Sequence, residues 1–235
     1  MLKLEDMLIR QGDFTLTADL AIPPGLTAVI GPSGGGKSTL LAAIAGFVLP
    51  ERGRITWMGQ DISAAPPAAR PVSVLFQDNN LFPHLTIAQN LGLALSPRLR
   101  LTDAHHRRID EALDRVDLGG LATRKPASLS GGQQGRAGLA RVLLADRPVV
   151  LLDEPFAALG PALRDEMLAL VRTELVDAGR TVLMVTHDPR DASAVAPRTI
   201  LVAEATASGP HDTEALFADP PPALSAYLGR SSRLS

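Results

Sequence analysis

The sequence predicts an α/β fold with a parallel sheet at its centre. Short apolar segments typical of strands alternate along the chain with longer segments of helical period, and a glycine-rich loop joins one strand directly to a helix. This alternation is typical of parallel strands connected by helices that pack on the sheet. Between about residues 86 and 145 only helical segments occur, which predicts a helical insertion in the α/β core.

Strand-like segments occur on both sides of the insertion. They comprise residues 15–20, 26–30, 53–59 and 71–76 before it, and residues 149–153, 181–186 and 199–203 after it. The first alternates between apolar and polar side chains, as half-buried strands do, whereas residues 26–30 are a continuous apolar run typical of a buried strand.

Helical periodicity predicts the remaining elements. The segments are residues 40–48, 86–95, 103–116, 131–145 and 161–179. The last of them begins with Pro161 and ends with Gly179, which are the residue types favoured at the first position and just past the end of a helix.

The composition excludes several classes of protein. The 235 residues carry a net charge of −2 and include no cysteine. The charge gives no basic field for nucleic acid, and without cysteine neither a disulfide framework nor a thiolate metal site can form. No apolar run approaches the ~18 residues of a membrane-spanning helix. The first residues lack the basic and then apolar order of a secretory signal, so we expect a soluble or peripheral protein.

A phosphate-binding loop is expected where the strand at 26–30 meets the next helix. The loop matches the pattern G-x-x-x-x-G-K-[ST] in full, so its N–H groups and the positive end of the helix would surround phosphate oxygens. Lys37 is expected to reach the β- and γ-phosphates and Ser38 to bind Mg²⁺. The predicted nucleotide-binding residues are Gly31, Pro32, Ser33, Gly34, Gly35, Gly36, Lys37, Ser38 and Thr39.

Polar side chains follow three of the other strand-like segments. Because ligands of open α/β sheets bind at the carboxyl ends of the strands, we expect these side chains beside the phosphate loop. Asp153 would hold Mg²⁺ through water and Glu154 would be the general base for the attacking water. Gln77 would contact metal and water, and His187 would hydrogen-bond the transferring phosphoryl group. Solvated residues at strand ends are the alternative.

A second glycine-rich helix start lies in the helical insertion, in the stretch LSGGQQGR. The first loop already holds the phosphates of one nucleotide. The second is therefore expected to face a nucleotide held by another copy, with Ser130, Gly131, Gly132 and Gln133 capping its γ-phosphate. This predicts a homodimer of twofold symmetry that ATP closes.

Together these motifs resemble those of the ATP-binding-cassette ATPases. GPSGGGKST, Gln77, LSGGQ, VVLLDEP and His187 occur in the order and spacing of that family over nearly the whole chain. The resemblance implies a P-loop cassette with a RecA-like core, an antiparallel β-subdomain and a helical subdomain, formed as one domain over residues 1–230. The core and β-subdomain would comprise 1–85 and 147–207, the helical subdomain 86–146, and a C-terminal helical tail 208–235.

Residues 70–95 and 153–171 resemble the ATPase subunits of bacterial thiamine importers in particular. This implies an enzyme that uses ATP and Mg²⁺ at the cytoplasmic face of the inner membrane, with two permease subunits, a periplasmic solute-binding protein as an indirect partner and no nucleic acid. Leu81, Phe82 and Leu85 would meet a coupling helix of the permease, or belong to the core of the helical subdomain. The alternatives are import of a polyamine, an oxyanion or iron, a soluble cassette protein acting on DNA or ribosomes, and a regulator without hydrolysis.

Three departures from the family pattern lead to further expectations. Gly160 stands where aspartate is usual, so we expect slower hydrolysis with ATP binding and dimerisation retained. Gly135 replaces a longer polar residue and costs its helix up to ~1 kcal/mol. No aromatic residue is evident for stacking on adenine, because Phe14 is expected to pack within its strand. Affinity would then depend on the phosphates and Mg²⁺, with loose discrimination between ATP and GTP.

Overall fold

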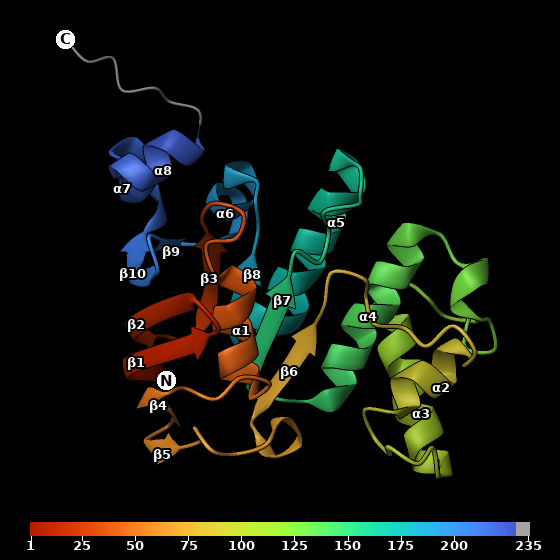
Figure 1. Cartoon of the computed structure of the whole chain (residues 1–235). Helices are drawn as coiled ribbons and strands as arrows, with labels where there is room; N and C mark the ends of the chain where they lie inside the picture. The colour runs from red at the N-terminus through yellow and green to blue at the C-terminus, as the bar shows by residue number, and fades with distance from the viewer. Residues whose placement is uncertain (229–235) are drawn as a thin grey trace.

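Within residues 1–228, which the computed structural model describes, ten strands pair into one sheet in the order β5-β4-β1-β2-β10-β9-β3-β8-β7-β6 (Figure 1). Strands β3, β6, β7, β8 and β9 are parallel, whereas β1, β2, β4 and β5 are antiparallel. The strands are β1 (Leu2–Gln11), β2 (Phe14–Ile22), β3 (Gly25–Ile30), β4 (Arg52–Trp57), β5 (Gln60–Asp61), β6 (Val72–Leu75), β7 (Val149–Asp153), β8 (Thr181–Val185), β9 (Arg198–Ala203) and β10 (Thr206–Asp212).

The central strands are buried on both faces. Successive side chains of β7 belong to two separate core clusters: Val150 and Leu152 to the first, Val149 and Leu151 to the second. This follows from the period of two in a strand, and it explains why these segments are continuous apolar runs. The prediction of an α/β fold around a parallel sheet is confirmed.

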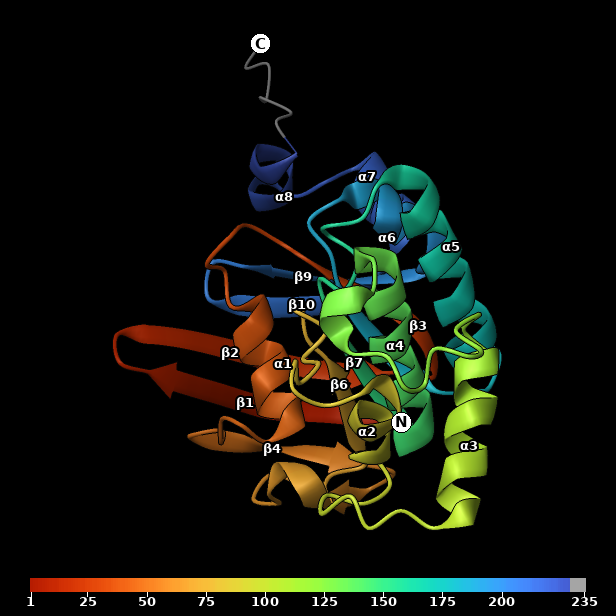
Figure 2. The same cartoon turned by 90° about the vertical axis from the view of Figure 1, so that its right-hand side faces the viewer.

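Some helices pack on the sheet, and three others form a separate group at one side of it. The helices are α1 (Lys37–Ala45), α2 (Ile87–Gly92), α3 (Asp103–Asp114), α4 (Gly131–Ala145), α5 (Pro161–Val171), α6 (Pro189–Val195), α7 (Thr213–Ala218) and α8 (Pro222–Tyr227). Helices α2, α3 and α4 lie together, away from β1 and β2 (Figures 1 and 2). Helix α4 has the predicted bounds, whereas α2 is shorter than predicted.

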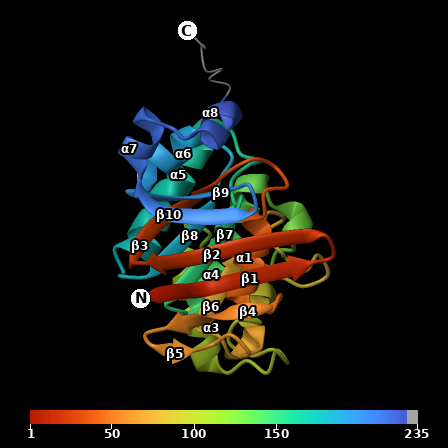
Figure 3. The ribbon, with the colours of Figure 1, turned by 60° about the vertical axis from the view of Figure 1, so that its left-hand side comes forward.

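Strand β1 was not predicted from the sequence. It lies between β2 and β4, as Figure 3 shows. Its buried side chains are Leu2, Leu4, Met7 and Ile9. The pairing register shifts between Leu4 and Met7, and Asp6 has a φ of 46°. Because a bulge of this kind adds one residue to the strand, the alternation that would have revealed β1 is broken.

The prediction of a helical tail from residue 208 is wrong for residues 208–212, which belong to β10. This strand pairs antiparallel with β9 and parallel with β2. Its sequence contains Gly209 and Pro210 and has no apolar alternation, so only its neighbours hold it as a strand. Helices α7 and α8 follow it. Residues 229–235 of the predicted tail lie outside the described residues.

In the described part of the chain, no helix is long and apolar enough to cross a membrane.

Candidate functional site

The glycine-rich loop joins the end of β3 to the start of α1 and depends on its glycines. A Cβ at Gly31 would overlap the carbonyl group of Val202. Gly36, with a φ of 107°, would place a Cβ 2.8 Å from Cζ of Phe14. Only glycine tolerates both the positive φ and this close approach. The loop curves around Lys37, whose Nζ donates to the carbonyl oxygens of Gly31 at 2.9 Å and Pro32 at 3.0 Å.

A hollow of about 500 Å³ opens beside this loop. It is lined by Gln11, Phe14, Ser33, Gly34, Gly36, Lys37, Ser38, Thr39 and Glu154. The structure therefore brings Glu154, from the end of β7, to the predicted phosphate loop.

Gln11, the last residue of β1, and Phe14, the first residue of β2, complete the lining of this hollow. Gln11 was missed in the sequence, because its position depends on β1 and only the folded sheet places it here. Thr39 Oγ1 donates to its Oε1 at 3.5 Å. Phe14 packs beside the second core cluster, as expected, but its ring also borders the hollow.

Oxygen atoms from α1 and β7 meet at the rim of the site. Ser38 Oγ donates to Asp153 Oδ1 at 3.5 Å. Burial raises the pKa of Asp153, and Glu154 adds to this, while the Ser38 hydrogen bond and the Lys37 charge oppose it. Burial also lowers the pKa of Lys37, against the attraction of Glu154 and Asp153. The charged forms of Asp153 and Lys37 thus both lose hydration. A cation beside Asp153 and an anion beside Lys37 would offset this loss.

Glu154 leaves β7 with a φ of 46°, in the left-handed region where residues other than glycine are uncommon. This backbone turn aims its side chain at the loop that follows β8. There His187 Nδ1 lies 3.4 Å from Glu154 Oε2. The structure therefore pairs two residues that the sequence assigned to catalysis.

Gln77 is a predicted catalytic residue that lies apart from the phosphate loop in the structure. It lies in an exposed turn just after β6. It lines neither the hollow beside the phosphate loop nor the apolar hollow on the other side of Ser38, which Phe47 and Phe76 line. The turn is tied instead to the helical group. Arg141 of α4 donates to the carbonyl oxygens of Asn79 at 3.0 Å and Asn80 at 2.6 Å.

The second glycine-rich segment begins α4 with a capping box. Ser130 Oγ accepts from the N–H of Gln133 at 3.3 Å, and Gln133 Oε1 accepts from the N–H of Ser130 at 3.0 Å. Gly132 packs so closely on Leu163 of α5 that a Cβ would overlap it. None of residues 130–133 lines the hollow at the phosphate loop. Within one chain, these two predicted anion sites are separate.

An apolar surface lies on the other side of Ser38 and Asp153. Phe47 is 59% exposed, and its ring centroid is 6.0 Å from that of Phe76. Further along, Phe82 is 47% exposed, whereas Leu81 packs against the first core cluster. Of the predicted permease contacts, Phe82 is thus free to meet a partner, while Leu81 has the core position that was its alternative.

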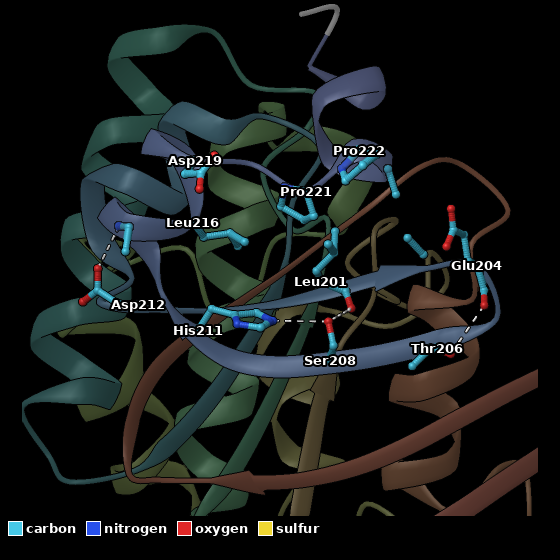
Figure 4. A pocket seen from close by; sticks show the side chains of 13 residues that line it. Leu201, Glu204, Thr206, Ser208, His211, Asp212, Leu216, Asp219, Pro221 and Pro222 are labelled. Atoms are coloured by element: carbon cyan, nitrogen blue, oxygen red, sulfur yellow. Dashed lines mark hydrogen bonds between the residues drawn. The ribbon is translucent and has the colours of Figure 1, made fainter. Parts of the chain in front are cut away.

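A larger hollow of about 820 Å³ lies elsewhere, between the β9–β10 hairpin and helices α7 and α8 (Figure 4). Its lining combines apolar side chains such as Leu201 and Leu216 with the carboxylates of Glu204, Asp212 and Asp219. It includes no residue of the phosphate loop and none of the predicted catalytic residues.

Comparison with known proteins identifies the family. The model of a family described as "ABC transporter" matches residues 17–157, from within β2 to just past Glu154. The chain belongs to the ABC transporter family. Curated relatives of this ABC cassette include two proteins named "Thiamine import ATP-binding protein ThiQ". The one from Cereibacter sphaeroides is 64% identical over 230 residues, which are 97% of this chain and 100% of the relative. The one from Ruegeria is 55% identical over the same shares.

Solved structures agree with the cassette fold. A dimeric ATP-binding cassette in a post-hydrolysis state, bound to ADP and Pi, matches 89% of this chain and 97% of its own at 28% identity, with a TM-score of 0.76. A nucleotide-free cassette from an ABC transporter matches 97% of this chain and 98% of its own chain, with a TM-score of 0.87. Its identity of 23% supports the fold alone. The predicted P-loop cassette is confirmed.

Proposed function

We propose that this chain is the ATP-hydrolysing subunit of an importer that takes up thiamine, or its phosphates, through a membrane permease. The observation that carries the enzymatic part is the single hollow at which Lys37, Ser38 and Glu154 meet. The solute is taken from the names of the relatives, because the cassette itself offers no chemistry for it.

The residues at the loop fit a magnesium nucleotide. The Ser38 hydroxyl and the Asp153 carboxylate are hard oxygen donors close to each other, which suits Mg²⁺, and the raised pKa of Asp153 reflects a burial cost that a cation would offset. Gln77 would join them once its turn moves toward the site. Mg²⁺ would supply charge neutralisation on the phosphates. Lys37 and the amides of residues 31–36 would bind the phosphates themselves.

The catalytic roles follow from the pair at the ends of β7 and β8. Glu154 would accept a proton from the attacking water, and His187 beside it would hydrogen-bond the transferring phosphoryl group. Gln11 and Phe14 border the same hollow, so the base of the nucleotide would lie against the β1–β2 turn. One half-buried phenylalanine ring there gives little to distinguish ATP from GTP.

The proposed partners are a second copy and the permease. Ser130, Gly131, Gly132 and Gln133 would cap a nucleotide bound to the other copy, since the first N–H groups of a helix are free for an anion. The exposed rings of Phe47 and Phe82 would meet the permease at the cytoplasmic face of the inner membrane. A periplasmic solute-binding protein would deliver the solute to the other side.

The proposal is tested by uptake of labelled thiamine in a host strain that lacks this chain. The wild-type chain should restore uptake and Glu154→Gln should not, whereas Glu111→Gln, on the exposed face of α3, should behave as wild type. Equal uptake with Glu154→Gln would refute the ATPase role. If the wild type hydrolyses ATP but restores no thiamine uptake, the solute is wrong, and competition with polyamines, oxyanions and iron would identify the class.

A further inference from the structure

The C-terminal helix α8 reaches back to the loop that carries His187. The hydroxyl of Tyr227, the last residue of α8, donates a hydrogen bond of 2.7 Å to the backbone carbonyl oxygen of His187. The ring of Tyr227 is half-buried and packs against the first core cluster. A residue 40 positions further along the chain therefore contacts the peptide group of a proposed catalytic residue.

Helix α8 provides a fixed support for this hydroxyl. Leu224 is fully buried, and Ala223 and Leu228 pack on the same core cluster. Ser225 Oγ donates to the carbonyl oxygen of Pro220 at 2.9 Å, a local bond that is separate from these core contacts. Pro222, the first residue of α8, borders the hollow of Figure 4. The contacts that fix the helix to the core come from residues further along it, such as Leu224 and Tyr227.

Other contacts within the His187 loop and from α5 hold the residues on either side of the histidine. Thr186 Oγ1 donates to Asp191 Oδ2 at 3.0 Å and accepts from the N–H of Asp188 at 3.1 Å. Arg164 of α5 forms ion pairs with Asp188 at 3.3 Å and Asp191 at 3.6 Å. The N–H of Asp188 and the carbonyl group of His187 belong to the same peptide, so Thr186 holds this peptide from within the loop and Tyr227 holds it from α8.

The phenol remains a donor under physiological conditions. Burial raises the pKa of Tyr227 above its usual range, and the negative charges of Glu154 and Asp188 raise it further. The hydroxyl is therefore protonated at neutral pH, and the carbonyl oxygen of His187 accepts from it.

We propose that Tyr227 is a positioning residue for ATP hydrolysis, which holds the His187 peptide so that the imidazole stays beside Glu154. This rests on the catalytic roles proposed above for His187 and Glu154. Tyr227 acts through His187, and α8 thereby becomes part of the support of the active site.

The test is Tyr227→Phe, which keeps the ring and its packing and removes only the hydroxyl. Loss of one ordinary hydrogen bond predicts a decrease in kcat of about fivefold. KM for MgATP should stay near its wild-type value, because the nucleotide contacts do not change. The melting temperature should fall no further than in Ser225→Ala, which also loses one hydrogen bond of α8. Ser225→Ala is the matched control, since it removes a different hydroxyl hydrogen bond of α8 and should leave kcat unchanged. An unchanged kcat in Tyr227→Phe, or an equal loss in Ser225→Ala, would overturn the inference.

A double-mutant cycle shows whether Tyr227 acts through His187. In a His187→Ala background, measured by single turnover of labelled ATP, adding Tyr227→Phe should cause no further loss. A fivefold loss in both backgrounds would mean a general structural effect and would overturn the inference. If His187→Ala alone keeps the wild-type kcat, the role proposed for His187 fails. A large loss in His187→Ala with none in Tyr227→Phe refutes only the role of Tyr227.

Discussion

The carboxyl end of β7 shows how single residues define this site. Asp153 ends the strand, and Glu154 then adopts a left-handed backbone conformation, which costs on the order of 1–3 kcal/mol for residues other than glycine. The N–H of Glu154 donates to the carbonyl oxygen of Val185 at 3.2 Å, which ties the turn to β8. In this strained conformation the carboxylate of Glu154 faces both the phosphate loop and His187.

Gly160 stands where the family resemblance led us to expect aspartate, and the structure leaves room for that side chain. It is the N-cap of α5, with φ −66° and ψ 161°, and a Cβ there would contact nothing within 4 Å. We predict that Gly160→Asp raises the turnover number of ATP hydrolysis by about threefold or more, equivalent to about 0.65 kcal/mol in the barrier. It should also stabilise the fold by a few tenths of a kcal/mol, roughly the gain of an aspartate cap over glycine.

Steady-state hydrolysis assays and urea unfolding would measure the two effects of this change. Gly160→Ala is the control, because it fills the same space without a carboxylate or a cap. A turnover number that is the same in all three proteins would sink the expectation that Gly160 slows hydrolysis.

At the scale of elements, α4 links the second glycine-rich segment to the turn after Gln77. Its N-terminal capping box holds Ser130, and Arg141 holds the turn at Asn79 and Asn80. Burial lowers the pKa of Arg141, while Asp78 opposes the shift. Arg141 therefore ties the position of this turn to α4.

Glycines within α4 make this helix less stable than its packing allows. A Cβ at Gly135 would lie 3.9 Å from Cε of Met167 and 4.0 Å from Oδ1 of Asn79, which are ordinary contacts. We predict that Gly135→Ala stabilises the protein by about 0.5–1 kcal/mol, because alanine loses less backbone freedom on folding. Urea unfolding followed by circular dichroism would measure this.

The matched comparison is Gly138→Ala in the same helix. There a Cβ would lie 2.7 Å from Cδ1 of the fully buried Leu75, so Leu75 must shift and the gain should disappear. Equal stabilisation by both substitutions would show that helix propensity alone sets the change in stability. It would then contradict the expected clash between a Cβ at position 138 and Leu75.

At the scale of the whole molecule, one chain contains the two proposed halves of a nucleotide site but holds them apart. The hollow at the phosphate loop lacks residues 130–133, and the similar solved cassette with bound ADP and Pi is a dimer. A symmetric dimer would complete each site with the second glycine-rich segment of the other copy.

This arrangement predicts complementation between two inactive variants. Lys37→Ala and Ser130→Arg should each hydrolyse ATP poorly, but a mixed dimer contains one site with both halves intact. A 1:1 mixture should recover about a quarter of the wild-type rate, because half of the dimers are mixed and each has one working site. Hydrolysis after mixing the purified variants is the measurement.

The control for complementation is a mixture of Lys37→Ala with Glu154→Gln. Both substitutions lie in the same half of the site, so no mixed dimer has an intact site and no activity should return. Recovery in this mixture, or none with Ser130→Arg, would contradict a site shared between copies.

The sequence by itself determined the central sheet and the chemistry at its edge. Buried parallel strands are continuous apolar runs, and the phosphate loop needs glycines at fixed spacing, so both are visible locally at residues 26–38 and 149–154. The capping box at Ser130 likewise marks the start of α4 in the sequence.

Only the tertiary structure decided the elements and contacts that depend on residues distant in the sequence. The bulge at Asp6 hid β1, and β10 is a strand because β9 and β2 flank it. Gln11 reaches the phosphate loop only through that hidden strand, and Tyr227 reaches His187 only because α8 packs back on the core. Each contact joins residues far apart in the chain, and such contacts leave no periodic signal in the sequence because packing, rather than local propensity, produces them.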